Sequence, residues 1–167
     1  MTRETYIRMT GMTRRIVARL PGGKIWLRVP TLVCAAAYLL ALLMLMLGRD
    51  VRLIRVLPVP AACFAVCTVL RPIIGRQRPY DRFAAEPVGS YRPGKGQSMP
   101  SRHTASAAAI ALAVAYAFPA PLLVVCMALL CLLIAALRVL CGQHYISDVL
   151  AALALSAVIS LIGYVLI

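Results

Sequence analysis

Long apolar segments constrain the fold of this chain more than any other feature of its sequence. Five of them follow one another, at Val29–Leu47, Leu53–Ile74, Ser101–Phe118, Leu122–Leu140 and from Tyr145 to the C-terminus. Each is close to the roughly 20 residues that an α-helix needs to cross a bilayer. Hydrophobic residues make up 62% of the 167 residues, against about 45–50% in an average soluble domain. The sequence therefore predicts an all-α integral membrane helical bundle with about five transmembrane helices.

The first 28 residues differ in composition from the rest of the chain, with seven basic residues and one acidic residue. Apolar residues recur among the arginines at helical spacing, a pattern typical of an amphipathic helix on a membrane surface. The sequence Pro21-Gly22-Gly23 is expected to end this helix. A disordered basic tail is the alternative interpretation. We therefore predict two parts, a basic amphipathic segment over residues 1–28 and a membrane-embedded domain over residues 29–167.

Polar residues that are unusual in membrane spans gather in three short segments, RPIIGRQRP, PSRH and RVLCGQHYISD. Because consecutive spans alternate in direction, the crossing count places all three segments on one face of the membrane. Ionisable residues inside membrane spans are expensive and mark functional sites by default. The candidate site residues in these segments are Arg71, Arg78, Ser101, Arg102, His103, Arg138, His144 and Asp148.

These residue types suit the chemistry of a phosphoryl group. Guanidinium groups bind phosphate oxygens through paired hydrogen bonds and neutralise their charge. Ser101 stands where it can cap the following helix, whose free amides attract anions. His144 and Asp148 are four residues apart, so the acid can orient the imidazole of a nucleophilic histidine. His103 is then available to protonate a leaving alkoxide.

Together the three segments resemble the signatures of the type 2 phosphatidic acid phosphatase superfamily, Lys-x6-Arg-Pro, Pro-Ser-Gly-His and Ser-Arg-x5-His-x3-Asp. The resemblance implies that His144 attacks phosphorus to form a phosphohistidine, that Asp148 orients it and that His103 is the leaving-group acid. It implies no cofactor and no metal ion. The implied phosphate-binding residues are Arg71, Arg78, Ser101, Arg102 and Arg138.

Three positions depart from the family pattern. Arg71 replaces the family's lysine, Arg102 replaces the glycine of the second signature, and Leu137 replaces the serine before Arg138. The implied substrate is a phosphate ester or diphosphate on a membrane lipid. Phosphatidate, phosphatidylglycerol phosphate and polyprenyl diphosphate all fit, and nothing in the sequence selects among them.

A non-enzymatic membrane bundle that binds or translocates anionic lipids is the alternative function. Such a protein needs cations but not the acid–base set of His103, His144 and Asp148, which favours an enzyme. Membrane lipids are the expected partners. Nucleic acid is not, because the basic residues are separated by long apolar spans and the chain has a single tryptophan. The oligomeric state is not predicted.

The basic residues also bear on orientation in the cell membrane. Only Arg49, Arg52 and Arg55 of the 18 basic residues fall on the face opposite the candidate site. The positive-inside rule therefore predicts a cytoplasmic site, whereas the family resemblance implies the outer face, and both remain open. We interpret Arg76, Arg82 and Lys95 as topology charges or contacts to lipid headgroups.

Overall fold

The computed structural model describes residues 1–91, 93 and 97–166, and these residues form helices joined by short turns and one longer loop. Lys95 lies outside the described residues. Proline occupies one of the first two positions of α2, α4, α5 and α7, where its fixed φ favours helix initiation. The elements are, in order, α1 (Arg3–Arg19), η1 (Gly23–Leu27), α2 (Val29–Leu47), α3 (Leu53–Val56), α4 (Pro58–Ile74), α5 (Pro79–Phe83), α6 (Arg102–Ala117), α7 (Pro121–Leu140), α8 (Ile146–Leu161) and η2 (Ile162–Leu166).

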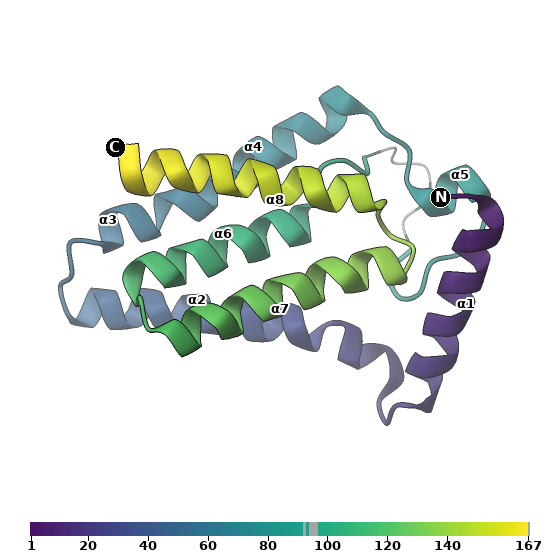
Figure 1. Cartoon of the computed structure of the whole chain (residues 1–167), viewed down its shortest axis with the longest axis horizontal. Helices are drawn as coiled ribbons and strands as arrows, with labels where there is room; N and C mark the ends of the chain where they lie inside the picture. The colour runs from purple at the N-terminus through teal and green to yellow at the C-terminus, as the bar shows by residue number, and fades with distance from the viewer. Residues whose placement is uncertain (92, 94–96, 167) are drawn as a thin grey trace.

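Helix α6 lies in the centre of the bundle and contacts α2, α4, α7 and α8 (Figure 1). Its alanine side chains permit this close packing on several faces. Ala105 and Ala109 pack against Cys63 and Cys67 of α4, while Ala107 and Ala108 belong to the core shared with α2 and α7. The first turn of α6 is thereby held in the middle of one end of the bundle.

Four helical segments among the described residues are long and apolar enough to cross a membrane, Val29–Leu47, Leu53–Phe83, Pro121–Leu140 and Ile146–Leu166. The remaining expected span became α6, which has only 16 residues. At 1.5 Å per residue that is about 24 Å, less than the roughly 30 Å of bilayer hydrocarbon. The all-α multi-pass membrane bundle is confirmed, with four spans that qualify alone and α6 as a shorter fifth helix enclosed by them.

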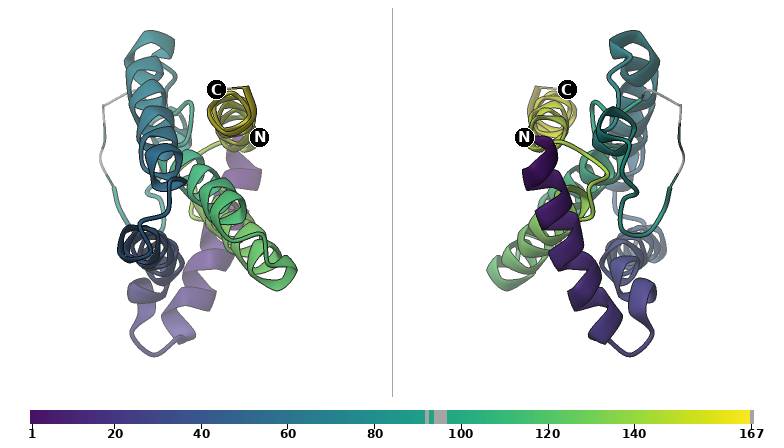
Figure 2. Two further views of the ribbon diagram at one scale, coloured as in Figure 1. Left: turned by 90° about the vertical axis from the view of Figure 1, so that its left-hand side faces the viewer. Right: turned by 90° about the vertical axis from the view of Figure 1, so that its right-hand side faces the viewer.

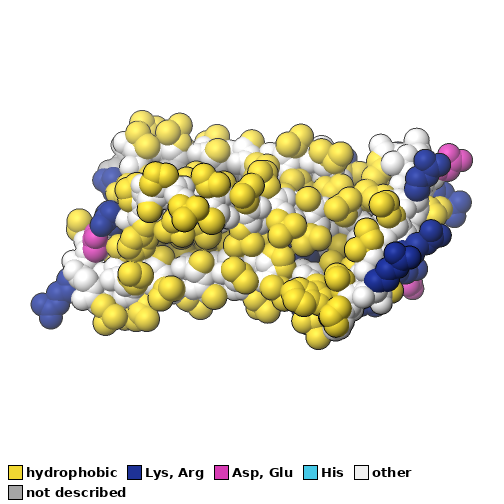
Figure 3. All heavy atoms as spheres, turned by 60° about the horizontal axis from the view of Figure 1, so that its bottom comes forward, with side chains coloured by type: hydrophobic (Ala, Val, Ile, Leu, Met, Phe, Trp, Pro, Cys, Tyr) yellow, Lys and Arg dark blue, Asp and Glu magenta, His cyan; other side chains and the backbone are white. Residues whose placement is uncertain are grey.

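The outer surface agrees with a membrane environment. Figure 3 shows apolar side chains along the whole length of the bundle, with lysine and arginine gathered at its two ends. Large apolar residues such as Leu39, Leu47 and Leu122 are mostly exposed on the helices. Exposed apolar area of this extent is rare on soluble monomers.

Helix α1 lies across one end of the bundle, as the end-on views show (Figure 2). It ends at Arg19, just before the expected proline and glycines. Tyr6, Thr10 and Val17 are buried toward the bundle, whereas Met12 and Ile16 are exposed beside them. An amphipathic surface helix is therefore present, and the alternative of a disordered tail is wrong for these residues.

Candidate active site

A cavity of about 810 Å³ lies between the end of α4, the first turn of α6 and the turn that joins α7 to α8. It brings together residues from all three polar segments of the sequence. Within the described chain no aspartate or glutamate lines it, so the wall is strongly positive. Six of the predicted site residues line this cavity, namely Arg71, Arg78, Arg102, His103, Arg138 and His144.

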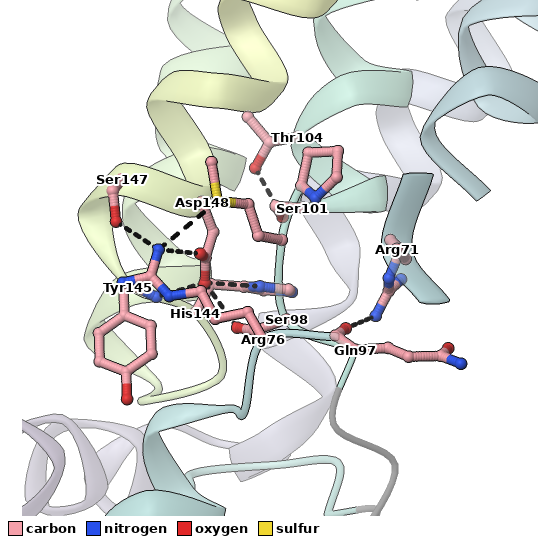
Figure 4. A network of polar contacts seen from close by, with 12 residues as sticks. Arg71, Arg76, Gln97, Ser98, Ser101, Thr104, His144, Tyr145, Ser147 and Asp148 are labelled. Carbon is pink, nitrogen blue, oxygen red and sulfur yellow. Dashed lines mark hydrogen bonds and ion pairs between the residues drawn. The ribbon is translucent and has the colours of Figure 1, made fainter. Parts of the chain in front are cut away.

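Asp148 lies behind His144, outside the cavity wall, at the start of α8 (Figure 4). Its carboxylate is fully buried, and Oδ2 is 3.5 Å from Nδ1 of His144. At this distance the contact is longer than a normal hydrogen bond. The carboxylate also accepts hydrogen bonds from the Ser98 hydroxyl at 2.5 Å and from the Tyr145 amide at 2.9 Å. These bonds fix the carboxylate beside the imidazole.

His144 is held in place by its backbone as well as by its neighbours. Its amide donates to the carbonyl oxygen of Arg138 at 3.2 Å, which closes the turn after α7. The residue is only 2% exposed, and it forms part of the cavity wall. Burial lowers the pKa of His144, an effect that Asp148 partly opposes. The imidazole is therefore neutral at neutral pH, the form in which a ring nitrogen can act as a nucleophile.

Two arginines carry buried donors that lack a partner among the described residues, and these are Nε of Arg71 and Nε of Arg138. Other nitrogens of both side chains are engaged. Arg71 donates to the carbonyl oxygen of Gln97, and Arg138 donates to the Gln143 side chain at 2.8 Å and to Thr31 at 3.3 Å. Leaving a buried donor unpaired costs about 1–3 kcal/mol. Both guanidinium groups therefore retain unused hydrogen-bonding capacity beside the cavity that their side chains line.

Ser101 has its expected position at the start of α6 but not its expected hydrogen bond. It is the N-cap residue of α6, but its side chain makes no capping hydrogen bond. Its hydroxyl accepts from Thr104 at 3.1 Å, and its amide donates to the carbonyl oxygen of Asp148 at 3.1 Å. Ser101 is not among the residues that line the cavity. The expectation that its side chain caps the helix is wrong, because the hydroxyl pairs with Thr104 of α6, while the backbone amide joins the start of α6 to Asp148 of α8.

Arg76 has a more specific position than a topology charge. Its Nη1 donates to Oδ1 of Asp148 at 2.8 Å and to the Ser147 hydroxyl at 2.7 Å, and its guanidinium lies 4.3 Å from the centre of the Tyr145 ring (Figure 4). This ion pair corrects our interpretation of Arg76. Ser98 was missed as well. Both residues hold the carboxylate of Asp148. Arg76 lies within the first polar segment and Ser98 two residues before the second, but their positions in the sequence did not predict this contact.

A glycine connects the N-terminal helix to the turn that carries His144. Gly142 has φ = 71°, a conformation that other residues adopt at a cost. A Cβ atom there would lie 2.6 Å from the ring of Tyr6 and 2.7 Å from the methyl of Thr10. Tyr6 is fully buried, and its hydroxyl donates to the carbonyl oxygens of Ala85 and Gly142. Burial raises the pKa of Tyr6 to about 12, so the hydroxyl remains a donor.

Gly142→Ala should therefore lower both stability and turnover. We expect a loss of about 2–4 kcal/mol from the left-handed backbone and the close contacts, and a fall in kcat of about 10- to 100-fold from displacement of His144. Thermal unfolding in detergent and phosphate release measure the two effects.

Gly11→Ala is the matched control, because a Cβ at Gly11 of α1 would meet nothing within 4 Å. It should be neutral or stabilising by up to about 1 kcal/mol. Equal behaviour of the two variants would show that α1 does not support the catalytic turn.

Comparison with known proteins identifies the family of this chain and proteins of similar fold. The family model described as the PAP2 superfamily matches residues 52–167. The structure is similar to the crystal structure of LpxE from Aquifex aeolicus, with a TM-score of 0.71 and 19% identity over 96% of this chain and 92% of that chain. It is also similar to a transmembrane PAP2 type phosphatidylglycerolphosphate phosphatase from Bacillus subtilis, with a TM-score of 0.69 and 20% identity over 96% and 83% of the respective chains. No curated protein sequence matches the chain.

Proposed function

The chain belongs to the PAP2 superfamily, and from this premise we propose that it is a lipid phosphatase, which hydrolyses a phosphate monoester or diphosphate on a membrane lipid through a phosphohistidine at His144. The observation that carries the proposal is the neutral, buried imidazole of His144, placed between a fixed carboxylate and a cavity lined by arginines. Cations alone would suit a lipid-binding protein. The histidine held against a buried acid suits catalysis.

The proposed reaction has two displacements. Nε2 of His144 attacks phosphorus, the bond from phosphorus to the leaving oxygen breaks, and His103 donates its proton to that oxygen, which is an alkoxide in a monoester and a phosphate oxygen in a diphosphate. Water then attacks the phosphorus of the phosphohistidine and gives up a proton to His103, the phosphorus–nitrogen bond breaks, and inorganic phosphate leaves with His144 restored. Asp148 favours the tautomer that carries hydrogen on Nδ1 and stabilises the positive ring. Arg71, Arg78, Arg102 and Arg138 would bind the phosphoryl oxygens in both steps.

A lipid can reach this site from the side of the bundle. A smaller, mainly apolar cavity of about 350 Å³ lies against the first, between α2, α4, α6 and α7. Thr31, Arg102 and His103 line both cavities. Cys34, Phe64 and Ile110 line the apolar one, which suits a hydrocarbon chain. A headgroup can thus lie at His144 while its tail remains in apolar surroundings, which supports a lipid substrate in the cell membrane.

We propose that no metal ion takes part. A catalytic magnesium ion needs carboxylate ligands, and the described lining of the cavity contains none. Guanidinium groups instead supply the positive charge that neutralises the oxygens of the reacting phosphoryl group. The reaction should therefore continue in the presence of EDTA.

The test is phosphate release from phosphatidate, phosphatidylglycerol phosphate and polyprenyl diphosphate by purified protein in detergent, with EDTA present. The proposal expects release from at least one of them. Full inhibition by EDTA that added magnesium reverses would contradict the metal-independent reaction. Failure to hydrolyse any of the three by well-folded protein would contradict the proposed function.

A further inference from the structure

Two basic residues outside the three polar segments share the candidate active site. Lys24 of η1 and Arg28, the residue before α2, line the same cavity as His103 and His144. Both precede residues 52–167, to which the family model matches. Neither side chain makes a hydrogen bond or ion pair with any residue that the structure describes. Their charges are therefore free to bind a ligand.

The segment that carries them is attached to the turn that bears the candidate nucleophile. Leu27 lies between Lys24 and Arg28 and packs against Val17, Val88 and Cys141. One helical turn after Arg28 comes Thr31, whose hydroxyl accepts a hydrogen bond from Arg138 at 3.3 Å. Lys24 and Arg28 are thus placed by packing and by a bond to the phosphate-binding side of the cavity.

The charge of the cavity exceeds what one phosphate needs. Its described lining contains six basic side chains and no acidic one, Lys24, Arg28, Arg71, Arg78, Arg102 and Arg138. A single phosphate monoester carries a charge of only about −2 at neutral pH. The four arginines already suffice for the oxygens of the phosphoryl group that reacts. A cavity of about 810 Å³ also has room for more than one such group.

We propose that Lys24 and Arg28 bind a second phosphoryl group of the substrate headgroup, so that lipids with two phosphoryl groups are preferred. This inference rests on the proposed function. The second group is either the inner phosphate of a lipid diphosphate or the phosphodiester of a headgroup such as phosphatidylglycerol phosphate. The terminal phosphoryl group is the one transferred to His144 in both cases.

The test compares three substrates at equal mole fraction in neutral detergent micelles: phosphatidate, phosphatidylglycerol phosphate and a polyprenyl diphosphate. The double variant Lys24→Gln/Arg28→Gln should lower kcat/KM by about 10- to 100-fold for a lipid with two phosphoryl groups, since two charged hydrogen-bonding groups are lost. For phosphatidate the change should stay below about threefold. If kcat/KM falls only for the diphosphate or only for phosphatidylglycerol phosphate, that result identifies the spacing between the two phosphoryl groups that Lys24 and Arg28 recognise.

Arg15→Gln/Arg19→Gln is the matched control, because these exposed residues have the same four-residue spacing in α1 and do not line the cavity. It removes the same charge from the same end of the protein and should affect all three substrates equally and weakly. Equal losses for all substrates, or equal effects of the two double variants, would overturn the inference. Wild-type activity on phosphatidate would leave the proposed function standing in that case, whereas inactivity on every substrate would contradict the function itself.

Discussion

Replacing His144 by alanine or asparagine should give a folded protein that no longer releases phosphate. Loss of the attacking nitrogen removes the covalent route entirely, and removal of a covalent nucleophile from other hydrolases lowers kcat by as much as about 10⁶-fold. We expect a loss of at least about 10⁴-fold. Asparagine is the more informative change, because its amide can still approach Asp148 while no atom remains to attack phosphorus.

The His144 variants need a separate test of folding. His144 is buried in a turn, so its replacement by alanine leaves a small void. Monodispersity in detergent and the unfolding temperature show whether the bundle is intact. Turnover by a well-folded His144→Asn variant within tenfold of wild type would contradict a nucleophilic role for this residue.

Asp148 should be almost as sensitive, and it should affect stability as well. Its carboxylate is fully buried and holds Arg76, Ser98 and the Tyr145 amide in addition to His144. Asp148→Ala leaves those donors unpaired and should lower the unfolding free energy by about 3 kcal/mol. Asp148→Asn keeps the shape but can favour the wrong imidazole tautomer, so kcat should fall on the order of 10³- to 10⁴-fold with a smaller loss of stability.

Asp50→Asn provides the control for Asp148. Asp50 also lies near the start of a helix and pairs with an arginine, Arg52, at 2.6 Å, but this pair is partly exposed at the other end of the bundle. Its removal should change stability by less than about 1 kcal/mol and leave kcat unchanged. If Asp148→Asn behaves like Asp50→Asn, the carboxylate does not govern the imidazole. Unfolding temperature and single-substrate kinetics in the same detergent decide between these results.

The main features of the fold could be predicted from the sequence because a bilayer imposes a simple rule on helix length and hydrophobicity. Val29–Leu47 and the span that ends at Leu140 have the expected boundaries to within one residue. Helix α6 departs from this rule, since it is enclosed by other helices and need not match the bilayer thickness alone. Its alanines allow neighbouring helices to approach closely, a property that hydropathy does not measure.

Contacts of the candidate site could be predicted from the sequence where both partners lie in one short segment at helical spacing. The contact of His144 with Asp148 follows from a separation of four residues. Contacts between distant segments could not be read in the same way. The bond from Arg76 to Asp148 spans 72 positions, and that from Ser98 spans 50.

The N-terminal segment shows the same limit. Its amphipathic pattern predicted a surface helix, but the pattern does not state what the inner face contacts. Tyr6 packs against Gly142 because α1 lies across the end of the bundle, and Lys24 joins the cavity wall because η1 packs beside the turn after α7. The spacing of residues in the sequence does not predict these tertiary contacts.

Transfer of the phosphoryl group to His144 is the central step of the proposed reaction, and trapping this intermediate tests it most directly. Wild-type protein would be mixed with a lipid phosphate labelled in the terminal phosphoryl group, quenched in alkali, where a phosphorus–nitrogen bond survives, and mapped by mass spectrometry. We predict label on His144 in wild type and in Asp50→Asn, and none in His144→Asn. Release of labelled phosphate in a single turnover with no labelled protein at any time would show direct attack by water and contradict the account.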